Sequence, residues 1–323
     1  MTARDIIALA IGDPNGIGPE IAVKAAAHYH GSAYRPLLVG SEQVIRHYAA
    51  RHAPQLALQR FDDAGQGVDG LVFHHVDGLD PADFAPGVVS PAAGRATVAY
   101  VAAAVQLARN GSVKAIVGCP HSETAINRAG IAFSGYPRLI AELTGTPTDQ
   151  VFLMLMASGL RIAHVTLHES VATALGRMNT ALVVEAGRAA VEALRQLGLP
   201  NPTLGVFGIN PHAGEDGLFG DEDERITRPA VARLRALGIA ADGPLGADLL
   251  LGQRKHDAYL AMFHDQGHIP IKLLSPLRAS ALSIGAGILF SSVGHGSAFD
   301  IAGKSVADPV AVIETLSLLY QTF

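Results

Sequence analysis

The sequence predicts an α/β protein with two interleaved α/β/α domains, and three observations lead to this prediction. Short apolar runs alternate with helical patterns along nearly the whole chain, which is typical of βαβ units and a covered, mostly parallel sheet. The 323 residues exceed one typical hydrophobic core, so two domains are expected. The sequence has no long linker, which indicates domains that interleave, with both chain ends in one of them.

In the first 119 residues, each apolar run is expected to be a buried strand that leads into a helix or a turn. Ser41 can cap the helix that follows the second run, and Asn110-Gly111 is typical of a helix end. The expected strands are Ile6–Ile11, Pro36–Val39, Leu71–His75 and Ala115–Cys119, and the expected helices include Gly18–His28 and Ala92–Asn110.

Two apolar runs on either side of Ala157-Ser158-Gly159 interrupt this alternation and predict a hairpin or a sharp reversal. Beyond the reversal, strands and helices alternate again. The expected strands are Val151–Met156, Leu160–Thr166, Thr203–Ile209, Ala258–Phe263 and the β-rich stretch Ala281–Val293, and the expected helices are Thr180–Leu197, Asp223–Leu237 and Pro309–Tyr320.

Composition excludes several classes of function. The net charge of −5 offers no electrostatic attraction for nucleic acid or an anionic membrane surface. A single cysteine, Cys119, rules out an internal disulfide and is expected to be a small buried residue at a strand end. The first apolar stretch runs directly into Gly-Asp-Pro-Asn-Gly, which is unlike a signal peptide, and no segment is long and apolar enough to span a bilayer. We therefore expect a soluble cytoplasmic protein.

Three histidines follow three of the expected strands, and this is the most informative feature of the chain. They are His168 in T-L-H-E-S, His212 in N-P-H-A-G-E and His264 in M-F-H-D-Q-G-H. Three neutral imidazoles that converge from strand ends would bind one divalent metal and leave coordination positions open for a substrate. Any one of these histidines alone is more often unrelated to a metal, but their shared position beside Asn, Asp or Glu favours a joint site.

The segment His264–Lys272 combines a potential metal ligand, a carboxylate and a lysine within nine residues. A nearby cation would disfavour the ammonium form of Lys272, which suits proton transfer near neutral pH. Pro270 is expected to stiffen the path between these groups, and the apolar residues around Lys272 argue against full exposure. The catalytic candidates are therefore Lys272 and Asp265.

Two glycine-containing segments are candidates for binding an anion or a nucleotide. Gly12–Glu20 joins the first strand to the first helix, but it lacks the G-x-G-x-x-G fingerprint and is better interpreted as a tight turn. In His295–Lys304, a Gly-Ser pair is expected to open a helix and to bring backbone N–H groups against a dinucleotide. The alternative is a simple loop with a helix cap at Ser297. The candidate cofactor-binding residues are His295, Gly296, Ser297, Ala298, Asp300 and Ile301.

Together these motifs resemble the 4-hydroxythreonine-4-phosphate dehydrogenase family, and the match covers essentially the whole chain in order. The motifs are G-D-P-N-G-I-G-P-E, A-I-N-R-A-G-I-A-F-S-G, N-P-H-A-G-E, H-D-Q-G-H-I-P-I-K and V-G-H-G-S-A-F-D-I-A-G. The last motif is also similar to the cofactor loop of isopropylmalate and isocitrate dehydrogenases, whose fold this family shares. The resemblance implies that fold, with a cleft between its two domains, and NAD-linked oxidation of a secondary alcohol.

The resemblance also implies a metal, a dimer and a division of labour between the domains. The family's metal ligands fall on His168, His212 and His264 and come from both subunits, which implies a homodimer with the metal site at its interface. Zinc is the expected metal, with Mg, Mn, Co or Fe as alternatives. Residues 1–130 with 282–323 are expected to form a terminal domain that carries much of the NAD site. Residues 131–281 are expected to form a central domain with the metal ligands and dimer contacts.

The departures from the family pattern concern its phosphate pocket. Tyr136-Pro137 stands where the family usually has a His-Thr pair, and Ala281 and Phe290 stand where it has an asparagine and an arginine. Burying a phosphate dianion without partners would be costly, so a flat carbocyclic substrate is expected instead. The candidate substrate-binding residues are Tyr136, Arg138, Lys272, Arg278 and Phe290.

Three segments closely resemble the terephthalate dihydrodiol branch of this family, namely C-P-H-S-E-T-A-I-N-R-A-G-I-A-F-S-G-Y-P, V-T-L-H-E-S and H-D-Q-G-H-I-P-I-K-L-L. That resemblance implies NAD- and metal-dependent oxidative decarboxylation of a cis-dihydrodiol dicarboxylate to protocatechuate, a step of aromatic catabolism. The alternative within the family is oxidation of 4-hydroxythreonine 4-phosphate or a related phosphosugar acid. A metal-dependent hydrolase could also use three histidines, but it would have no use for a dinucleotide loop. A binding protein without catalytic activity is a weaker interpretation.

Overall fold

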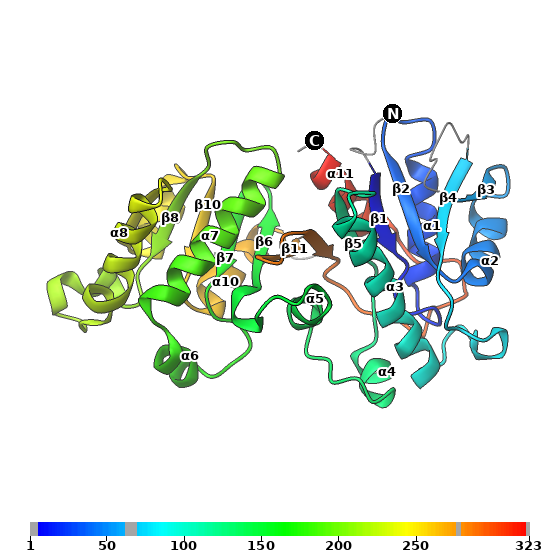
Figure 1. Ribbon diagram of the computed structural model, residues 1–323, viewed down its shortest axis with the longest axis horizontal. Helices are drawn as coiled ribbons and strands as arrows, with labels where there is room; N and C mark the ends of the chain where they lie inside the picture. Colours follow the sequence, from blue (N-terminus) through cyan, green and yellow to red (C-terminus); the bar gives the residue numbers. More distant parts are fainter. Residues whose placement is uncertain (1–5, 62–69, 276–278, 321–323) are drawn as a thin grey trace. The chain divides into compact units, whose positions relative to one another are not determined.

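The structure, a computed structural model, describes residues 6–61, 70–275 and 279–320, and the chain forms two compact units. Unit 1 comprises Met1–Leu139 and Ile288–Phe323, and unit 2 comprises Ile140–Gly287. Figure 1 follows the chain from blue through green and yellow to red. Its first and last elements, β1 (Ile6–Ala10) and α11 (Val310–Tyr320), both belong to unit 1.

The strands of unit 1 are all parallel and lie in the order β3-β4-β2-β1-β5-β12. The central strand β1 pairs with β2 and β5, and Ile7, Ala8 and Leu9 have no exposed surface. Such continuous burial is what a parallel sheet requires when helices cover both of its faces. The other strands are β2 (Arg35–Gly40), β3 (Ala57–Arg60), β4 (Gly70–His75), β5 (Ala115–Gly118) and β12 (Leu289–Ser292).

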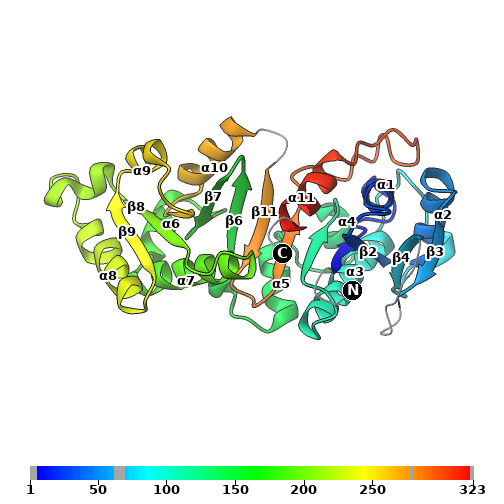
Figure 2. The ribbon, with the colours of Figure 1, turned by 90° about the horizontal axis from the view of Figure 1, so that it is seen from above.

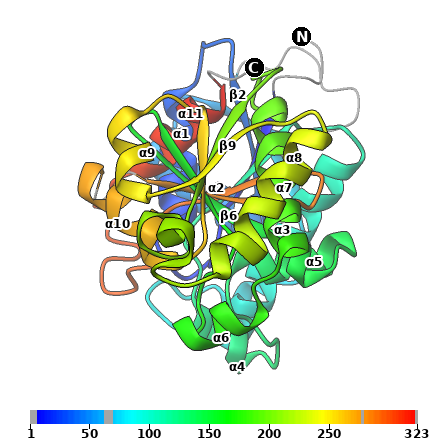
Figure 3. The same cartoon turned by 90° about the vertical axis from the view of Figure 1, so that its left-hand side faces the viewer.

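Helices cover both faces of this sheet. Helices α1 and α11 lie on one side of the strands and α3 lies on the other, as Figures 2 and 3 show. Ser41 occupies the N-cap position of the second helix as predicted, but its hydroxyl makes no capping bond, because it donates to Val76 O (3.3 Å) and accepts from Tyr100 (2.9 Å). The first N–H of this helix, that of Glu42, donates instead to His75 Nδ1 (3.1 Å). The helices are α1 (Gly18–His28), α2 (Glu42–His52), α3 (Pro91–Arg109) and α4 (Glu123–Arg128).

The strands of unit 2 lie in the order β11-β6-β7-β10-β8-β9, and β6 is antiparallel to both of its neighbours. The predicted hairpin between β6 and β7 is confirmed. Its two turn residues, Ser158 and Gly159, have φ angles of 48° and 77°, which suit the tight turns that join twisted strands. The strands are β6 (Phe152–Ala157), β7 (Leu160–His164), β8 (Thr203–Phe207), β9 (Ala240–Leu245), β10 (Ala258–Ala261) and β11 (Ser280–Ile284).

Two helices of unit 2, α7 and α10, pack on opposite faces of these strands (Figure 2). Helix α10 was not predicted, because Pro270 lies inside it and proline usually ends a helix. The predicted segment Asp223–Leu237 consists of a wide helical turn, Asp223–Thr227, followed by α8. The helices are α5 (Tyr136–Thr144), within which the chain passes into unit 2, and α6 (Val171–Arg177), α7 (Thr180–Gln196), α8 (Arg228–Ala236), α9 (Ala247–Gln253) and α10 (His264–Leu274).

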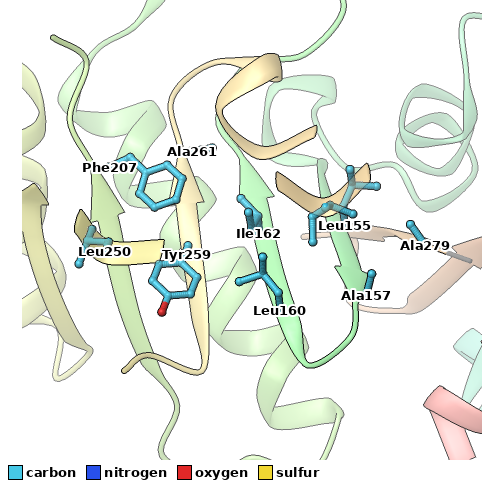
Figure 4. Close-up of a cluster of buried hydrophobic side chains, with 10 residues drawn as sticks. Leu155, Ala157, Leu160, Ile162, Phe207, Leu250, Tyr259, Ala261 and Ala279 are labelled. Atoms are coloured by element: carbon cyan, nitrogen blue, oxygen red, sulfur yellow. The ribbon is translucent and has the colours of Figure 1, made fainter. Parts of the chain in front are cut away.

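A buried cluster fixes β7, β10 and β8 side by side. Ile162 of β7 is in register with Tyr259 of β10, and the Tyr259 ring lies 5.8 Å from that of Phe207 on β8 (Figure 4). All three side chains are at most 1% exposed. Because the three strands are parallel, their carboxyl ends meet at one edge of the sheet and form a rigid platform. Within the described part of the chain, no helix is both long and apolar enough to cross a membrane.

Candidate functional site

The three predicted metal ligands lie just beyond the carboxyl ends of the adjacent strands β7, β10 and β8. His168 follows β7, His264 is the first residue of α10 after β10, and His212 lies in a turn after β8. The imidazoles of His168 and His264 approach each other, with ring centroids 5.3 Å apart. The structure therefore brings two of the three ligands together within one chain.

His264 and His212 each have one ring nitrogen next to a carboxylate. His264 Nδ1 lies 2.7 Å from an oxygen of Asp265, and His212 Nδ1 lies 2.9 Å from an oxygen of Glu215. A carboxylate oxygen accepts, so Nδ1 is the donor in each pair, and in the neutral ring Nε2 then keeps its lone pair for a ligand. Metal-binding histidines are typically held in this way. In this chain Asp265 therefore orients His264.

His212 lies in a strained left-handed turn, Pro211–Gly217. Five consecutive residues from His212 to Asp216 have φ angles between 44° and 86°, and only one of them is glycine. Left-handed backbone costs roughly 1–2 kcal/mol for each residue with a side chain. Strain of this size persists where surrounding contacts enforce it, and it is common at functional sites. The turn leaves the His212 side chain 70% exposed.

A buried carboxylate, Asp223, holds the start of this turn. Its oxygens accept from the backbone N–H groups of Ile209 (2.8 Å) and Asn210 (2.9 Å) and from the Thr227 hydroxyl (2.6 Å). Asp223 has no exposed surface, so these bonds are well shielded from water. The sequence interpretation missed this role, because an acidic residue at the start of an amphipathic segment is usually solvated.

Within one chain, the His212 ring does not contact the rings of His168 and His264. The ring contact of His212 is with Phe219, at 6.1 Å between centroids, and not with His168 or His264. Among residues 6–61, 70–275 and 279–320, no three His, Cys, Asp or Glu side chains are grouped closely enough to hold a metal ion. The three-histidine metal site and its location at a dimer interface therefore stay predictions.

Two further histidines, missed by the sequence interpretation, lie beside His264. His268 is one turn further along α10, and its ring stacks on that of His264 with centroids 3.6 Å apart and planes at 12°. His164 at the end of β7 is fully buried, and its Nε2 lies 3.1 Å from His268 Nδ1. Burial lowers the pKa of His164 to about 3 and that of His268 to about 4, so both rings are neutral. A helical period across residues 264–272 would have revealed His268.

Lys272 lies on the same face of α10, one turn beyond His268. In the single chain the Lys272 side chain is exposed. The expectation that its apolar neighbours partly bury it is therefore wrong for the single chain. The sequence led us to expect that Pro270 stiffens the path to Lys272. In the structure the helical repeat of α10 places Lys272 on the same side as His264 and His268.

Two of the four residues that replace the family's phosphate pocket, Tyr136 and Phe290, lie in unit 1 and form a buried aromatic cluster with His121, whereas Pro137 and Ala281 are partly buried and Ala281 belongs to unit 2. Tyr136 is 5% exposed, and its ring lies 4.6 Å from that of Phe290 and 4.5 Å from that of His121. The Tyr136 hydroxyl donates to Cys119 O (3.3 Å), and burial raises the pKa of this tyrosine. Burial also lowers the pKa of His121 to about 4, so the cluster is uncharged at neutral pH.

The remaining substrate candidates differ in their placement. Phe290 has no exposed surface, so in this conformation it packs against the Tyr136 ring and cannot itself contact a substrate. Gly118 leaves room for both rings, since a Cβ there would lie 2.9 Å from Phe290 and 3.2 Å from Tyr136. Arg138 is exposed, and Arg278 lies outside the described residues.

The predicted cofactor loop is not helical. Residues 293–309 form turns, bends and irregular backbone, so the prediction of a helix opened by the Gly-Ser pair is wrong. The loop instead rests on the first glycine-rich turn, where Ile17 N donates to Ser297 O (2.9 Å). A Cβ at Gly16 would lie 2.8 Å from the Cβ of Ser297, so only glycine allows this contact. His295, Gly296 and Asp300 are exposed, whereas Ser297 is buried.

An ion pair on α1 holds the far end of this loop. Glu20 is fully buried, and its Oε1 accepts from Lys24 (2.7 Å) and from the backbone N–H of Ala307 (2.9 Å). Lys24 also donates to the carbonyl oxygens of Ser305 (3.3 Å) and Ala307 (2.8 Å). The segment after the first strand therefore supports both ends of the predicted NAD loop.

Replacing Glu20 by alanine is expected to weaken NAD binding roughly tenfold. The change leaves the Ala307 N–H without its partner, which costs about 1–3 kcal/mol, and each 1.4 kcal/mol corresponds to a factor of ten. Isothermal titration with NAD measures the effect. The control is Glu185→Ala, which removes an acid that pairs with Arg188 on the surface of unit 2. Equal NAD affinity in the two variants would contradict a supporting role for Glu20.

Comparison with known proteins finds several similar dehydrogenases. The chain is 54% identical, over 314 residues, to a 1,2-dihydroxy-3,5-cyclohexadiene-1,4-dicarboxylate dehydrogenase from a Comamonas species, covering 97% of this chain and 96% of the relative. It is 38% identical to a D-threonate 4-phosphate dehydrogenase from Cupriavidus necator, covering 96% and 95% of the two chains. A solved terephthalate 1,2-cis-dihydrodiol dehydrogenase from Burkholderia xenovorans LB400 is 50% identical, with a TM-score of 0.81 and 98% of each chain covered.

A more distant structure concerns the fold alone. A β-decarboxylating dehydrogenase from Thermococcus kodakarensis superimposes with a TM-score of 0.50 at 14% identity, covering 98% of this chain and 83% of that one. The predicted fold class, related to isocitrate and isopropylmalate dehydrogenases, is thereby confirmed. The expected enzyme class is confirmed as well, and the chain is a dehydrogenase. The family model of the pyridoxal phosphate biosynthetic protein PdxA matches residues 32–319, and the chain belongs to this family.

Proposed function

We propose that the protein oxidises the cis-dihydrodiol of terephthalate with NAD and releases carbon dioxide to give protocatechuate. The observation that carries the proposal is the uncharged cluster of Tyr136, Phe290 and His121, where a phosphate pocket would need charged or donor groups. A phosphate dianion would lose its hydration there without gaining partners, whereas a flat ring would keep favourable contacts. The relative with 54% identity, named for a cyclohexadiene dicarboxylate diol, supports the same substrate.

The proposed reaction has two balanced steps. The secondary carbinol carbon gives a hydride to NAD and its hydroxyl gives a proton to a base, which forms a ketone β to a carboxylate. The bond from the ring to that carboxylate then breaks, carbon dioxide leaves, and the electron pair forms an enolate that takes up a proton. The resulting enol is a catechol, so aromaticity makes the sequence effectively irreversible.

His168, His212 and His264 are the residues we propose to hold a divalent metal, with zinc as the expected ion. When bound, the metal would stabilise negative charge on oxygen, and NAD would accept the hydride. The donor set fits this role, because Asp265 and Glu215 leave the Nε2 atoms of two of these histidines free. Since His212 does not meet the others in one chain, we propose a homodimer in which two subunits complete the site.

Lys272 is the group that we propose to move the proton, since it lies on the same helical face as His264. Arg138, which is exposed, is a candidate partner for a substrate carboxylate. The loop from His295 to Ile301 is the proposed NAD site, with Asp300 available to adenosine hydroxyls. The proposed metal ligands and Lys272 thus belong to unit 2, whereas the Tyr136 cluster, Arg138 and the proposed NAD loop belong to unit 1.

A substrate panel tests the proposal. The protein is mixed with NAD and zinc and offered the terephthalate cis-diol, its isophthalate counterpart, 4-hydroxythreonine 4-phosphate and D-threonate 4-phosphate. We expect NADH and carbon dioxide to appear together, and only with the ring diols. NADH formation with a phosphate compound but with neither diol would overturn the substrate assignment.

A further inference from the structure

Two histidines that the proposed reaction does not use form a chain of contacts that ends on His264. His164, at the end of β7, has Nδ1 3.2 Å from the carbonyl oxygen of Leu153 on the neighbouring strand β6. Its Nε2 lies 3.1 Å from Nδ1 of His268 on α10. The ring of His268 in turn stacks on the ring of His264. This series of contacts links the interior of the sheet to the proposed metal ligand His264.

The contacts fix where each proton lies. A carbonyl oxygen only accepts, so His164 must carry its proton on Nδ1, and its Nε2 therefore accepts. His268 must then donate from Nδ1, which also lies 3.1 Å from the carbonyl oxygen of His264. Both rings are held in one tautomer and one orientation. Because His164 has no exposed surface, water does not compete for these bonds.

Gly267 makes this arrangement possible. A Cβ at this position would clash with Nε2 of His164 and lie 2.8 Å from its Cε1, so any side chain would displace the His164 ring. The helix α10 therefore approaches β7 closely because residue 267 has no side chain. A substitution at Gly267 can therefore disturb the contact between His164 and His268 without removing either histidine.

The stack bears directly on the orientation of His264. With centroids 3.6 Å apart and an interplanar angle of 12°, the His268 ring restricts rotation of the His264 ring on one face. The carboxylate of Asp265 holds its Nδ1 at 2.7 Å. A ring limited by both contacts presents Nε2 in one direction, and this preorganisation favours metal binding.

We propose that His164 and His268 are positioning residues for His264, which they hold ready to bind the metal ion. This inference rests on the proposed function, since it takes His264 as a metal ligand. His268 stacks on His264, and His164 fixes His268. The stack of His268 on His264 and the hydrogen bond of His268 to His164 should therefore both contribute to metal affinity.

The test uses the full-length protein and measures zinc affinity by chelator competition, together with the visible absorption spectrum of the cobalt(II) form. His268→Leu removes the stack and the hydrogen bond, and we expect zinc affinity to fall about 10- to 100-fold, as is typical when a supporting contact of a metal ligand is lost. His268→Phe keeps a ring on His264 and should recover part of the loss. Gly267→Ala, which keeps both histidines, should weaken binding and change the cobalt spectrum.

Two comparisons keep the outcomes separate. Ile269→Ala, on the same helix with a side chain 54% exposed, is the matched control and should bind zinc as the wild type does. If His264→Ala binds zinc as tightly as the wild type, the proposed metal site fails. If His264→Ala loses zinc but His268→Leu, His268→Phe and Gly267→Ala match the wild type in affinity and spectrum, only the positioning role is overturned. Circular dichroism identifies a variant that does not fold, in which case the two remaining variants decide.

Discussion

Replacing His264 by alanine is expected to abolish zinc binding and to lower kcat/KM at least about 1,000-fold. A bound Lewis acid contributes several kcal/mol to stabilisation of the developing negative charge, and each 1.36 kcal/mol is a factor of ten in rate. The same result is expected for His168→Ala, whose ring lies 5.3 Å from that of His264, and for His212→Ala. Metal content by atomic absorption and initial rates of NADH formation measure both effects.

The control for histidine loss is His28→Ala, an exposed histidine at the end of α1 in unit 1. It should keep its zinc content and its rate. The comparison between His168→Ala and His212→Ala also tests the dimer. If two subunits complete each site, mixing these inactive variants should restore part of the activity, because some mixed dimers would contain one intact site. Wild-type zinc content in all three alanine variants would contradict the three-histidine site.

Replacing Lys272 by alanine is expected to reduce kcat about 100- to 10,000-fold with little change in NAD affinity. Proton transfer by a positioned side chain contributes an effect of this size, and Lys272 lies in unit 2, whereas the proposed NAD loop lies in unit 1. Steady-state kinetics with the terephthalate cis-diol give kcat, and titration with NAD gives the affinity.

Lys272→Arg separates two roles for the lysine. Arginine keeps the positive charge but does not give up a proton near neutral pH. If Lys272 moves a proton, the arginine variant should remain as slow as the alanine variant. If Lys272 only binds a substrate carboxylate, the arginine variant should recover most of the rate. Wild-type kcat in the alanine variant would remove Lys272 from the reaction.

The sequence was sufficient to predict the elements that depend on local pattern. The strands that end at the platform of unit 2 are mostly apolar runs, although β7 includes Arg161, and the hairpin turn at Ser158-Gly159 contains a glycine, which accepts positive φ. Helix α10 was missed because Pro270 is a strong helix breaker, although here the helix continues through it. The prediction of a helix after the Gly-Ser pair was wrong, because contacts with Gly16 and Glu20, rather than local helix propensity, determine the shape of that loop.

Parts of the candidate site depend on contacts between distant residues and could not be predicted from local pattern. The left-handed turn of His212 is unfavourable for its own residues and persists because Asp223 binds the backbone before it. The contact of His164 with His268 joins a strand and a helix that are far apart in sequence. The family resemblance identified Tyr136 and Phe290 as unusual, but their burial and ring contact required the fold.

The most direct test of the proposed function is the ratio of kcat/KM for the terephthalate cis-diol to that for 4-hydroxythreonine 4-phosphate. Both substrates are measured with the same zinc-loaded protein and saturating NAD. Because a charged group without partners in the uncharged Tyr136 cluster costs several kcal/mol, we expect a ratio of at least about 1,000, with one carbon dioxide released for each NADH. A ratio below one, or NADH formed from the diol without carbon dioxide, would contradict the proposed oxidative decarboxylation of a ring diol.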